Sequence, residues 1–415
     1  MKDKKQILFI EGYNTVMLYK IARAFKEKEY ETVLIRIAGQ NPEDKSFYNN
    51  AFEKVIDIDL PYKNLAHESF SSIFFSLLKG SKNFLGAFLK ILRLKPYVII
   101  GRAPSSIPIV LFRILFQRYP LIYFSYDIRA LSDPKPELLK KYSTSIELKA
   151  DRFCFEHSDG VIHKGAPEEL NYINGRILGD NIRLPENRLS FQPYCSKEFI
   201  VPFNKNKLSR KDKEIHLVFV GGVLKPNADY YLSQLKSFEK IIQQKIHLHF
   251  YFCSDVSSKK DLESEKKVKE SFFKTYKNYP NIKYFHIENS FNAKDIVKEI
   301  SKYDFGIGPY SSVKESGLDP KFGMGNKIST YLEAGLPAIY GRPYLFINKI
   351  MKKYKAGLIW PKNMNTVKKM IKNLDYKKLE KDIEKARENY SMEKNFSKLE
   401  KFISKVAESK KKKIH

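Results

Sequence analysis

Short apolar runs alternate with helical patterns along the first half of the chain. The run QILFI (residues 6–10) leads through Gly12 into a stretch where Leu18, Ile21 and Phe25 keep helical spacing, and TVLIRI follows. Later runs end in Gly or Asp, namely YVIIG, LIYFSYD and GVIHKG. Parallel strands that are buried on both faces have this continuous apolar character. The pattern predicts βαβ units and an α/β fold.

The same alternation restarts in the second half. A polar, lysine-rich passage follows FQPYC (191–195), and then come the runs IHLVFVGG, IHLHFYFC, IKYFHI, DFGIGPY and PAIYG. We therefore expect two Rossmann-like, doubly wound domains facing a cleft, with ligands at the carboxyl ends of the strands. The expected parts are an N-terminal domain (1–200), a C-terminal domain (201–385), and a C-terminal helix with a basic tail (386–415) that packs back on the first domain.

Composition narrows the class of protein. The 415 residues carry 75 Lys+Arg against 47 Asp+Glu, a formal charge of +28, but 43% hydrophobic residues exclude a disordered polycation. Such a charge suits nucleic acid, anionic lipid or phosphorylated small molecules. The three cysteines show no metal-ligand spacing and are expected to be buried thiols. The apolar run at the start is too short for a signal peptide, and no long apolar stretch follows, so we expect a cytoplasmic protein without a membrane span.

The stretch GMGNKISTYLEAGLPAIYG has the features of an anion-binding loop. Gly323 and Gly325 precede Asn326, a good N-cap residue, and a short helix is expected from Lys327 to Ala334 with Gly335 at its C′ position. Free backbone N–H groups at a helix start, together with a lysine, can hold a phosphate. A flexible loop with an ordinary cap and a solvated lysine is the alternative.

These residues carry a family resemblance. NKISTYLEAGLPAIY, with YDFGIGPY and HLVFVGGVLKP before it, resembles the donor-binding domain of GT-B glycosyltransferases, closest to family 4 (group 1). ADRFCFEHSDGVIHKG is similar to the helix and strand near the end of the amino-terminal domain in that family. The similarity covers most of the chain, although its specific motifs are confined to the second half. It implies the GT-B fold, with an acceptor-binding N-terminal domain (1–200) and a nucleotide-sugar-binding C-terminal domain (201–385). It also implies a nucleotide-sugar donor and hexosyltransferase-like activity.

The resemblance also assigns donor-binding residues. Gly221 and Gly222 match the glycine turn that approaches the donor phosphates in the family. The family usually places an Arg directly after the glycine and a Lys five residues later. Here Gly222 holds the first of these places, and Lys225 lies nearby but out of register.

The paired glutamates of family 4 are missing. Their places hold Phe322 and Thr330, and Glu333 lies about one helical turn after Thr330, from where its carboxylate could reach the same region. Thr330 can still form a hydrogen bond. The departure leaves the donor sugar and the stereochemical outcome open.

The chemistry of glycosyl transfer requires positive potential where the nucleoside diphosphate departs. Lysines supply it, so we expect neither a metal ion nor a cofactor. Candidate residues at strand ends of the first domain are Asp127 and His163 for catalysis, Gly12, Arg129 and Lys164 for acceptor binding, and Glu11 as a weaker catalytic candidate. Asp127 could instead be a turn or cap residue, and His163 an ordinary strand-end histidine.

A basic segment without carboxylates predicts a membrane contact. No Asp or Glu lies between Ser69 and Tyr126. The basic residues in residues 69–118 are Lys79, Lys82, Lys90, Arg93, Lys95, Arg102, Arg113 and Arg118. An apolar stripe accompanies them, formed by Phe74, Leu77, Leu78, Leu85, Phe88, Leu89 and Leu92. This combination is typical of an interfacial helix on anionic lipid; a domain helix that covers the sheet is the alternative. The tail from residue 409 to 415 is expected to be a frayed end that adds to the attraction.

Together these features favour a glycosyltransferase at the inner face of the membrane. It would move a sugar from a nucleotide-sugar donor to a lipid-linked or membrane-borne glycan acceptor, as in bacterial-type surface polysaccharide or glycolipid synthesis. The alternatives are a nucleotide-sugar 2-epimerase of the same fold, a non-catalytic sugar-nucleotide sensor, and a nucleic-acid-binding protein. The chain lacks the basic-aromatic motifs of RNA-binding modules, so no nucleic-acid partner is expected.

Overall fold

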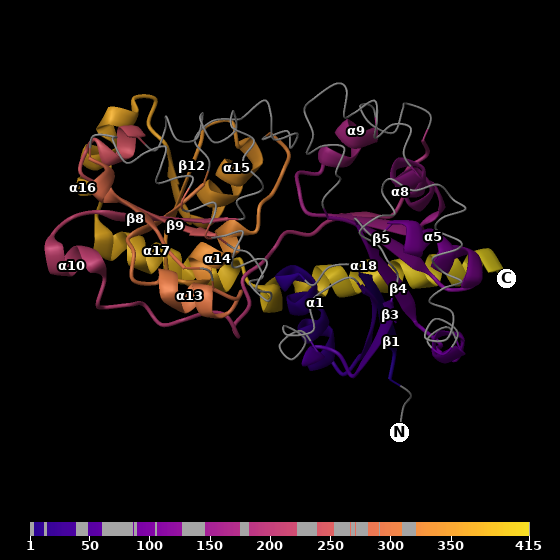
Figure 1. Ribbon diagram of the computed structural model, residues 1–415. Helices are drawn as coiled ribbons and strands as arrows, with labels where there is room; N and C mark the ends of the chain where they lie inside the picture. The colour runs from indigo at the N-terminus through magenta and orange to yellow at the C-terminus, as the bar shows by residue number, and fades with distance from the viewer. Residues whose placement is uncertain are drawn as a thin grey trace. The chain divides into compact units, whose positions relative to one another are not determined.

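The chain forms two compact units (Figure 1). The structure, a computed structural model, describes residues 4–11, 15–38, 49–59, 86, 89–103, 106–126, 146–174, 182–221, 239–252, 266, 270, 281–289, 291–308 and 321–414. The first unit comprises Met1–Gln192 with Phe396–His415, and the second comprises Pro193–Asn395. The expected boundary after residue 200 thus falls inside the second unit, and the expected C-terminal part is divided between the two.

The first unit contains a seven-stranded parallel sheet in the order β3-β2-β1-β4-β5-β6-β7. Its strands are β1 (Gln6–Glu11), β2 (Glu31–Ala38), β3 (Lys54–Asp59), β4 (Val98–Arg102), β5 (Leu121–Ser125), β6 (Gly160–His163) and β7 (Arg188–Ser190). The chain runs outward from β1 through β2 to β3 and then returns to the other side of β1 with β4. The fold therefore reverses direction between β1 and β4.

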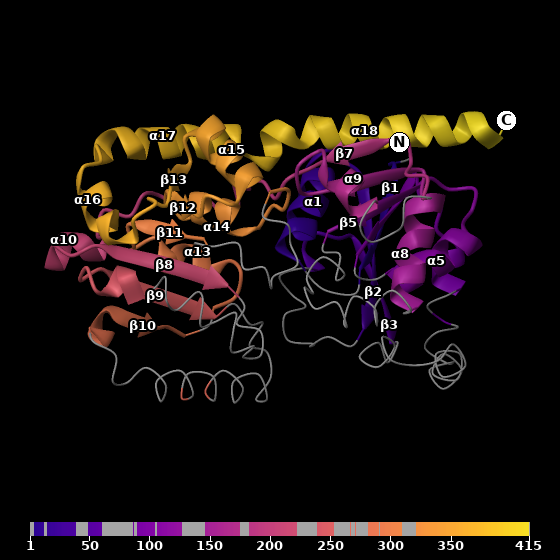
Figure 2. The ribbon, with the colours of Figure 1, turned by 90° about the horizontal axis from the view of Figure 1, so that it is seen from above.

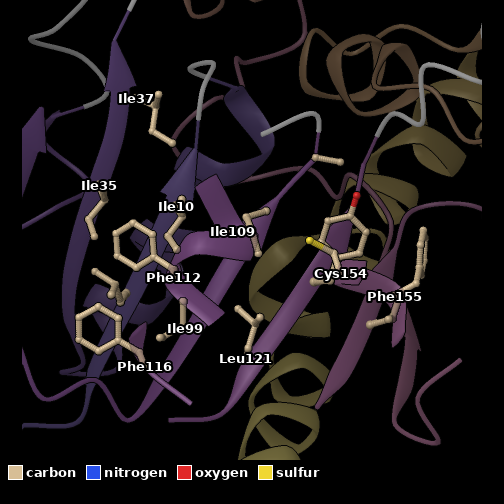
Figure 3. Packing of buried hydrophobic residues seen from close by; sticks show 14 of the residues in the cluster. Ile10, Ile35, Ile37, Ile99, Ile109, Phe112, Phe116, Leu121, Cys154 and Phe155 are labelled. Atoms are coloured by element: carbon tan, nitrogen blue, oxygen red, sulfur yellow. The ribbon is translucent and has the colours of Figure 1, made fainter. Parts of the chain in front are cut away.

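Helices flank this sheet because each presents an apolar stripe to it. They are α1 (Val16–Glu27), α5 (Ser106–Leu115), α8 (Ile146–His157) and α9 (Glu169–Ile173). The start of α1 is capped by Thr15, whose hydroxyl accepts a hydrogen bond from the Leu18 N–H. Figure 3 shows Ile109 and Phe112 of α5 packed with Ile99 and Leu121 of the sheet.

The second unit contains a six-stranded parallel sheet in the order β10-β9-β8-β11-β12-β13 (Figure 2). Its strands are β8 (His216–Gly221), β9 (His247–Phe252), β10 (Phe285–Ile287), β11 (Phe305–Ile307), β12 (Ala338–Tyr340) and β13 (Gly357–Ile359). Its helices are α10 (Leu208–Asp212), α13 (Asp295–Ile300), α14 (Lys327–Glu333), α15 (Leu345–Tyr354), α16 (Val367–Lys372) and α17 (Tyr376–Asn389). Here the direction reverses between β8 and β11.

The long C-terminal helix α18 (Met392–Ile414) joins the first unit from Phe396 onward. The rings of Phe396 and Phe25 lie 4.8 Å apart, and the Tyr30 hydroxyl donates to Glu400 at 3.0 Å. Near the end of the helix the Lys410 ammonium lies 3.2 Å from Asp159. The expectation of a frayed tail was therefore wrong, because the described tail residues are helical and Lys410 has a carboxylate partner.

The apolar runs located the strands well. Every run named above contains a strand, and Cys154 and Cys195 are buried thiols as expected, while Cys253 lies outside the described residues. The runs did not indicate β3, β7 and β13, all three of which are edge strands.

Candidate functional site

The first candidate site lies at the carboxyl ends of β8 and β11. These strands are neighbours in the second sheet, and the chain leaves them toward opposite sides. Such switch points form the crevices in which open α/β sheets bind ligands. Gly221 ends β8 and Ile307 ends β11.

Tyr331 of α14 closes this end of the sheet. Its hydroxyl accepts a hydrogen bond from the Val220 N–H at 3.2 Å and donates one to the Ile307 carbonyl at 2.8 Å. Its ring lies over Gly306, where an added Cβ would come within 2.2 Å of the ring. Tyr331 therefore fixes α14 to both strands.

Lys327 lies one helical turn before Tyr331 and is held in place with it. Its ammonium is 5.0 Å from the centre of the Phe219 ring. A Cβ added to Gly221 would lie 3.2 Å from the same nitrogen. The structure thus brings together Gly221 and Lys327, two of the residues that the sequence assigned to the donor phosphates.

The loop before α14 differs from expectation in its capping. Asn326 holds the N-cap position, but with φ −70° and ψ −20° it is helical, and its side chain makes no capping bond. A capping side chain normally needs an extended backbone at this position. The Asn326 carbonyl instead accepts bonds from the hydroxyls of Ser329 at 2.8 Å and Thr330 at 3.4 Å. Because α14 has only seven residues, the positive charge here comes chiefly from the Lys327 side chain.

The other end of α14 is as expected, except that the helix stops at Glu333. Gly335 has φ +75°, and its N–H bonds the Leu332 carbonyl while the Leu336 N–H bonds the Tyr331 carbonyl. This is a Schellman motif, which requires a left-handed residue at C′.

Glu333 does not face the switch point. Its carboxylate accepts a hydrogen bond from the Ser196 N–H at 2.8 Å, and the residue is 1% exposed. The position gives no support to Glu333 as a substitute for the missing glutamates, because the carboxylate already satisfies a buried backbone group. Gly323 and Gly325 are half-buried, and an added Cβ at Gly325 meets nothing within 4 Å. Gly222 and Lys225 lie outside the described residues.

A second candidate site lies at the switch point of the first sheet. Glu11 ends β1, Arg102 ends the neighbouring β4, and the two form a buried ion pair. The Thr15 hydroxyl also donates to Glu11 at 3.1 Å. Burial raises the pKa of Glu11 to about 7, against the lowering effect of Arg102.

Two cations share one aromatic ring at this edge. The Lys164 ammonium is 4.1 Å from the centre of the Tyr126 ring, and the Arg102 guanidinium carbon is 4.8 Å from it. His163, at the end of β6, is buried, and its Nδ1 lies 3.0 Å from Glu169, which also accepts the Gly165 N–H at 3.0 Å. The structure therefore groups Lys164 with Glu11 and Arg102 and ties His163 to α9.

Sequence reasoning gave too little weight to the Glu11–Arg102 pair. Each residue is the charged last position of an apolar run, FIE and VIIGR, and that signal marks a strand end at the ligand-binding edge. Gly12, Asp127 and Arg129 lie outside the described residues.

The basic segment proves to be mixed in character. Two of its basic residues are not available for the predicted membrane contact, because Arg102 pairs with Glu11 and Arg113 lies 3.0 Å from Asp159. Both have acidic partners that are distant in sequence. Lys90, Arg93, Lys95 and Arg118 are exposed. The exposed apolar residues of the same segment are Leu89, Leu92, Leu111, Ile114 and Leu115. Lys79, Lys82 and most of the apolar stripe lie outside the described residues.

Solved structures match nearly the whole chain. Sucrose-phosphate synthase from Thermosynechococcus elongatus has a TM-score of 0.61 at 12% identity, with 99% of each chain covered. Anabaena HepE, solved with UDP and glucose, has a TM-score of 0.61 at 12% identity, covering 97% of this chain and 98% of its own. A Listeria monocytogenes protein assigned as a UDP-N-acetylglucosamine 2-epimerase has a TM-score of 0.53 at 12% identity, covering 95% and 94%. The chain therefore has the GT-B fold, as the sequence predicted.

No protein-family model and no curated protein matches the sequence. Membership of family 4 stays a prediction. Within the described part of the chain, no helix is both long and apolar enough to span a bilayer.

Proposed function

We propose that this protein is a glycosyltransferase that uses a nucleotide-sugar donor. The observation that carries the proposal is the Lys327 ammonium beside Gly221 at the switch point of the second sheet, in a chain that has the GT-B fold. Glycine at this strand end leaves room for a phosphate to approach the backbone, and the ammonium supplies the opposite charge. The UDP bound in HepE is consistent with such a donor.

The reaction then needs no metal ion at the phosphates. The nucleoside diphosphate gains negative charge as it leaves, and a preorganised lysine stabilises that charge without having to reorganise. On the acceptor side we propose Arg102 and Lys164 as anion-binding groups and Glu11 as a group that can take a proton from an acceptor hydroxyl, because its raised pKa lies near neutral pH. Asp127 and His163 stay predicted catalytic residues.

The donor site is tested by nucleotide binding. Lys327→Ala should weaken the binding of UDP, GDP or CDP by about 1.5–3 kcal/mol, the range for a charge-assisted contact. Lys352→Ala, an exposed lysine of α15, is the matched control and should bind like the wild type. Gly325→Val should fold normally, because nothing lies within 4 Å of its Cβ, and should weaken binding only if the ligand occupies that space. Equal calorimetric affinities for wild type and Lys327→Ala would overturn the donor site.

The acceptor we propose is lipid-linked or membrane-borne, with the protein docked at the inner face of the membrane. The support is the exposed set of cations and aliphatic side chains described above, which combines charge attraction with apolar insertion. The exposed cations precede β4 and β5 in the chain and so lie toward the amino ends of these strands, whereas Glu11 and Arg102 lie at carboxyl ends. Substitutions of these cations therefore leave the Glu11–Arg102 edge untouched.

Vesicle co-sedimentation tests this docking. Lys90, Arg93, Lys95 and Arg118, all changed to Glu, should abolish binding to anionic vesicles at low salt while nucleotide binding persists. The control reverses four exposed lysines of α17, namely Lys377, Lys378, Lys381 and Lys385, which changes the net charge equally. Equal loss in both variants would indicate an effect of net charge alone, and a wild type that ignores anionic vesicles would indicate a soluble acceptor.

A 2-epimerase is the second candidate. It is favoured by the Listeria neighbour and by a buried acid and a histidine at strand ends of the first sheet, Glu11 and His163. Incubation with UDP-N-acetylglucosamine in the absence of an acceptor decides between them: an epimerised product supports the epimerase, and the absence of conversion together with transfer to an added acceptor supports the transferase.

A further inference from the structure

Four histidines gather on the second sheet, at the end remote from Gly221. His216 begins β8, His247 and His249 lie on β9, and His286 lies on β10. His216 is paired in register with His247, and His249 with His286. The rings stack, with centres 4.4 Å apart for the first pair and 4.3 Å for the second. The cluster exists only because three strands place their imidazoles on one face.

Carboxylates surround the cluster and determine which ring nitrogens carry hydrogen. His216 Nε2 lies 2.8 Å from Asp212, and His249 Nδ1 lies 2.7 Å from Glu288. His247 Nε2 contacts Glu214 in the same way. An ionised carboxylate can only accept, so each of these nitrogens is the donor, and the opposite nitrogen of a neutral ring is left with a lone pair.

Two such lone pairs then face each other. His216 Nδ1 and His249 Nε2 are 3.0 Å apart, and neither has a hydrogen to give when both rings are neutral. The contact becomes favourable when a cation lies between them. His247 adds a third nitrogen, since one ligand atom from each of the three histidines lies within 4.8 Å of the others. In the part of the chain that the structure describes, no other set of three histidines, cysteines or carboxylates comes together in this way.

We propose that His216, His247 and His249 bind a divalent transition-metal ion, of which Zn²⁺ is the best fit. Neutral imidazoles are preferred ligands of Zn²⁺, and metal-bound histidines characteristically donate their other ring N–H to a carboxylate, as Asp212, Glu214 and Glu288 allow here. Tetrahedral Zn²⁺ with bonds of about 2.0–2.1 Å separates its ligands by about 3.3 Å. To bind the ion, His216 Nδ1 and His249 Nε2 must therefore move slightly apart from their 3.0 Å separation, and the His247 ring must rotate modestly toward them.

The exposure of the four histidines indicates the side from which an ion can enter the site. His216 and His249 are buried, whereas His247 and His286 are half-buried, so an ion would enter from the side of β10. His286 Nε2 lies 2.8 Å from His247 Nδ1, where it or a water molecule can complete the coordination. An ion here would join β8 to β9 and, through Asp212, to the end of α10. It would stabilise the sheet from the end opposite to the candidate donor site, so the inference does not depend on the proposed function.

The test begins with the full-length protein freed of metal by a chelator and titrated with Zn²⁺ in a competition assay. We expect one ion per chain in the wild type and at least about 100-fold weaker binding in the His216→Ala/His249→Ala double variant. His157→Ala is the matched control, an exposed histidine of α8 in the first unit, and should bind Zn²⁺ like the wild type. Glu288→Gln keeps all the imidazoles and should weaken binding by about 10–100-fold, as loss of an orienting carboxylate does.

Spectra of the wild type with Co²⁺ in place of Zn²⁺ cover the case in which the double variant does not fold. Intense visible ligand-field bands are expected for a tetrahedral imidazole site, and weak octahedral bands would overturn the proposal. So would equal Zn²⁺ affinity in the wild type and a folded double variant. If imidazole ¹⁵N NMR signals are unchanged by Zn²⁺ and show one ring of the pair protonated, the cation between the lone pairs is a proton and the metal site is refuted.

Discussion

Replacing Tyr331 by Phe isolates the contribution of one hydroxyl group to the second unit. Phe keeps the ring over Gly306, so the packing is retained. The bonds from the Val220 N–H and to the Ile307 carbonyl are lost.

The expected cost follows from the geometry of these two bonds. A buried backbone group left without a partner costs about 1–3 kcal/mol. The bond to Ile307, at 2.8 Å, is of ordinary length, whereas the bond from Val220, at 3.2 Å, is long, so the first should dominate. We expect the free energy of unfolding to fall by about 2–3 kcal/mol. Nucleotide affinity should fall as well, because Tyr331 holds the helix that carries Lys327.

Tyr340→Phe is the matched control. Tyr340 is equally buried, but among the described residues its hydroxyl has no hydrogen-bond partner. Its removal relieves a buried unsatisfied group, so the variant should be as stable as the wild type or more so.

Urea unfolding followed by tryptophan fluorescence makes the comparison. Trp360 is the only tryptophan, is buried in the second unit, and donates its indole N–H to the Gly308 carbonyl at 3.4 Å. Its fluorescence therefore reports on the unit that contains Tyr331, which matters because a chain of two units need not unfold in one step. If the two variants agree within about 0.5 kcal/mol, the hydroxyl bridge does not hold α14 to the sheet.

Two further predictions concern pH and metal ions. The pKa of Glu11 is about 7 in the folded protein, compared with an ordinary value of 4.5. Between these two pH values the folded state therefore binds more protons at Glu11 than the unfolded state does. For this reason Glu11 makes the free energy of unfolding fall as the pH rises from about 4.5 to 7. Glu11→Gln should remove this contribution to the pH dependence of stability. Thermal unfolding followed by circular dichroism at pH 5 and pH 8 should then give a smaller difference in melting temperature for the variant than for the wild type. Equal differences would contradict the raised pKa. Glycosyl transfer should survive removal of Mg²⁺ and Mn²⁺ by EDTA, because Lys327 supplies the positive charge at the phosphates. The Asp-x-Asp sequence that ends β3 could offer carboxylates to a metal ion, but the Asp57 carboxylate is already paired with the Arg36 guanidinium at 2.6 and 3.1 Å. Activity that is lost in EDTA and restored by Mg²⁺ or Mn²⁺, but not by Zn²⁺, would refute metal independence.

The order of apolar runs determined much of this fold from the sequence alone. Strands buried on both faces need continuous apolar segments, and the helices between them need a repeating stripe, so both kinds of element are visible in local patterns. The Schellman motif at Gly335 and the position of Lys327 in the first turn of its helix are local in the same sense. They allowed the sequence to predict a phosphate-binding loop in the second unit, and that site stays a prediction.

Only the tertiary structure decided which distant residues meet. Glu11 and Arg102 pair because β4 returns to lie beside β1, and the histidines cluster because the register of β8, β9 and β10 places them on one face. Glu333 has the spacing of a ligand-binding residue, yet its carboxylate binds the backbone of Ser196. Local patterns encode the face of an element, but the partner of that face is set by the order and register of strands, which arise from packing over the whole unit.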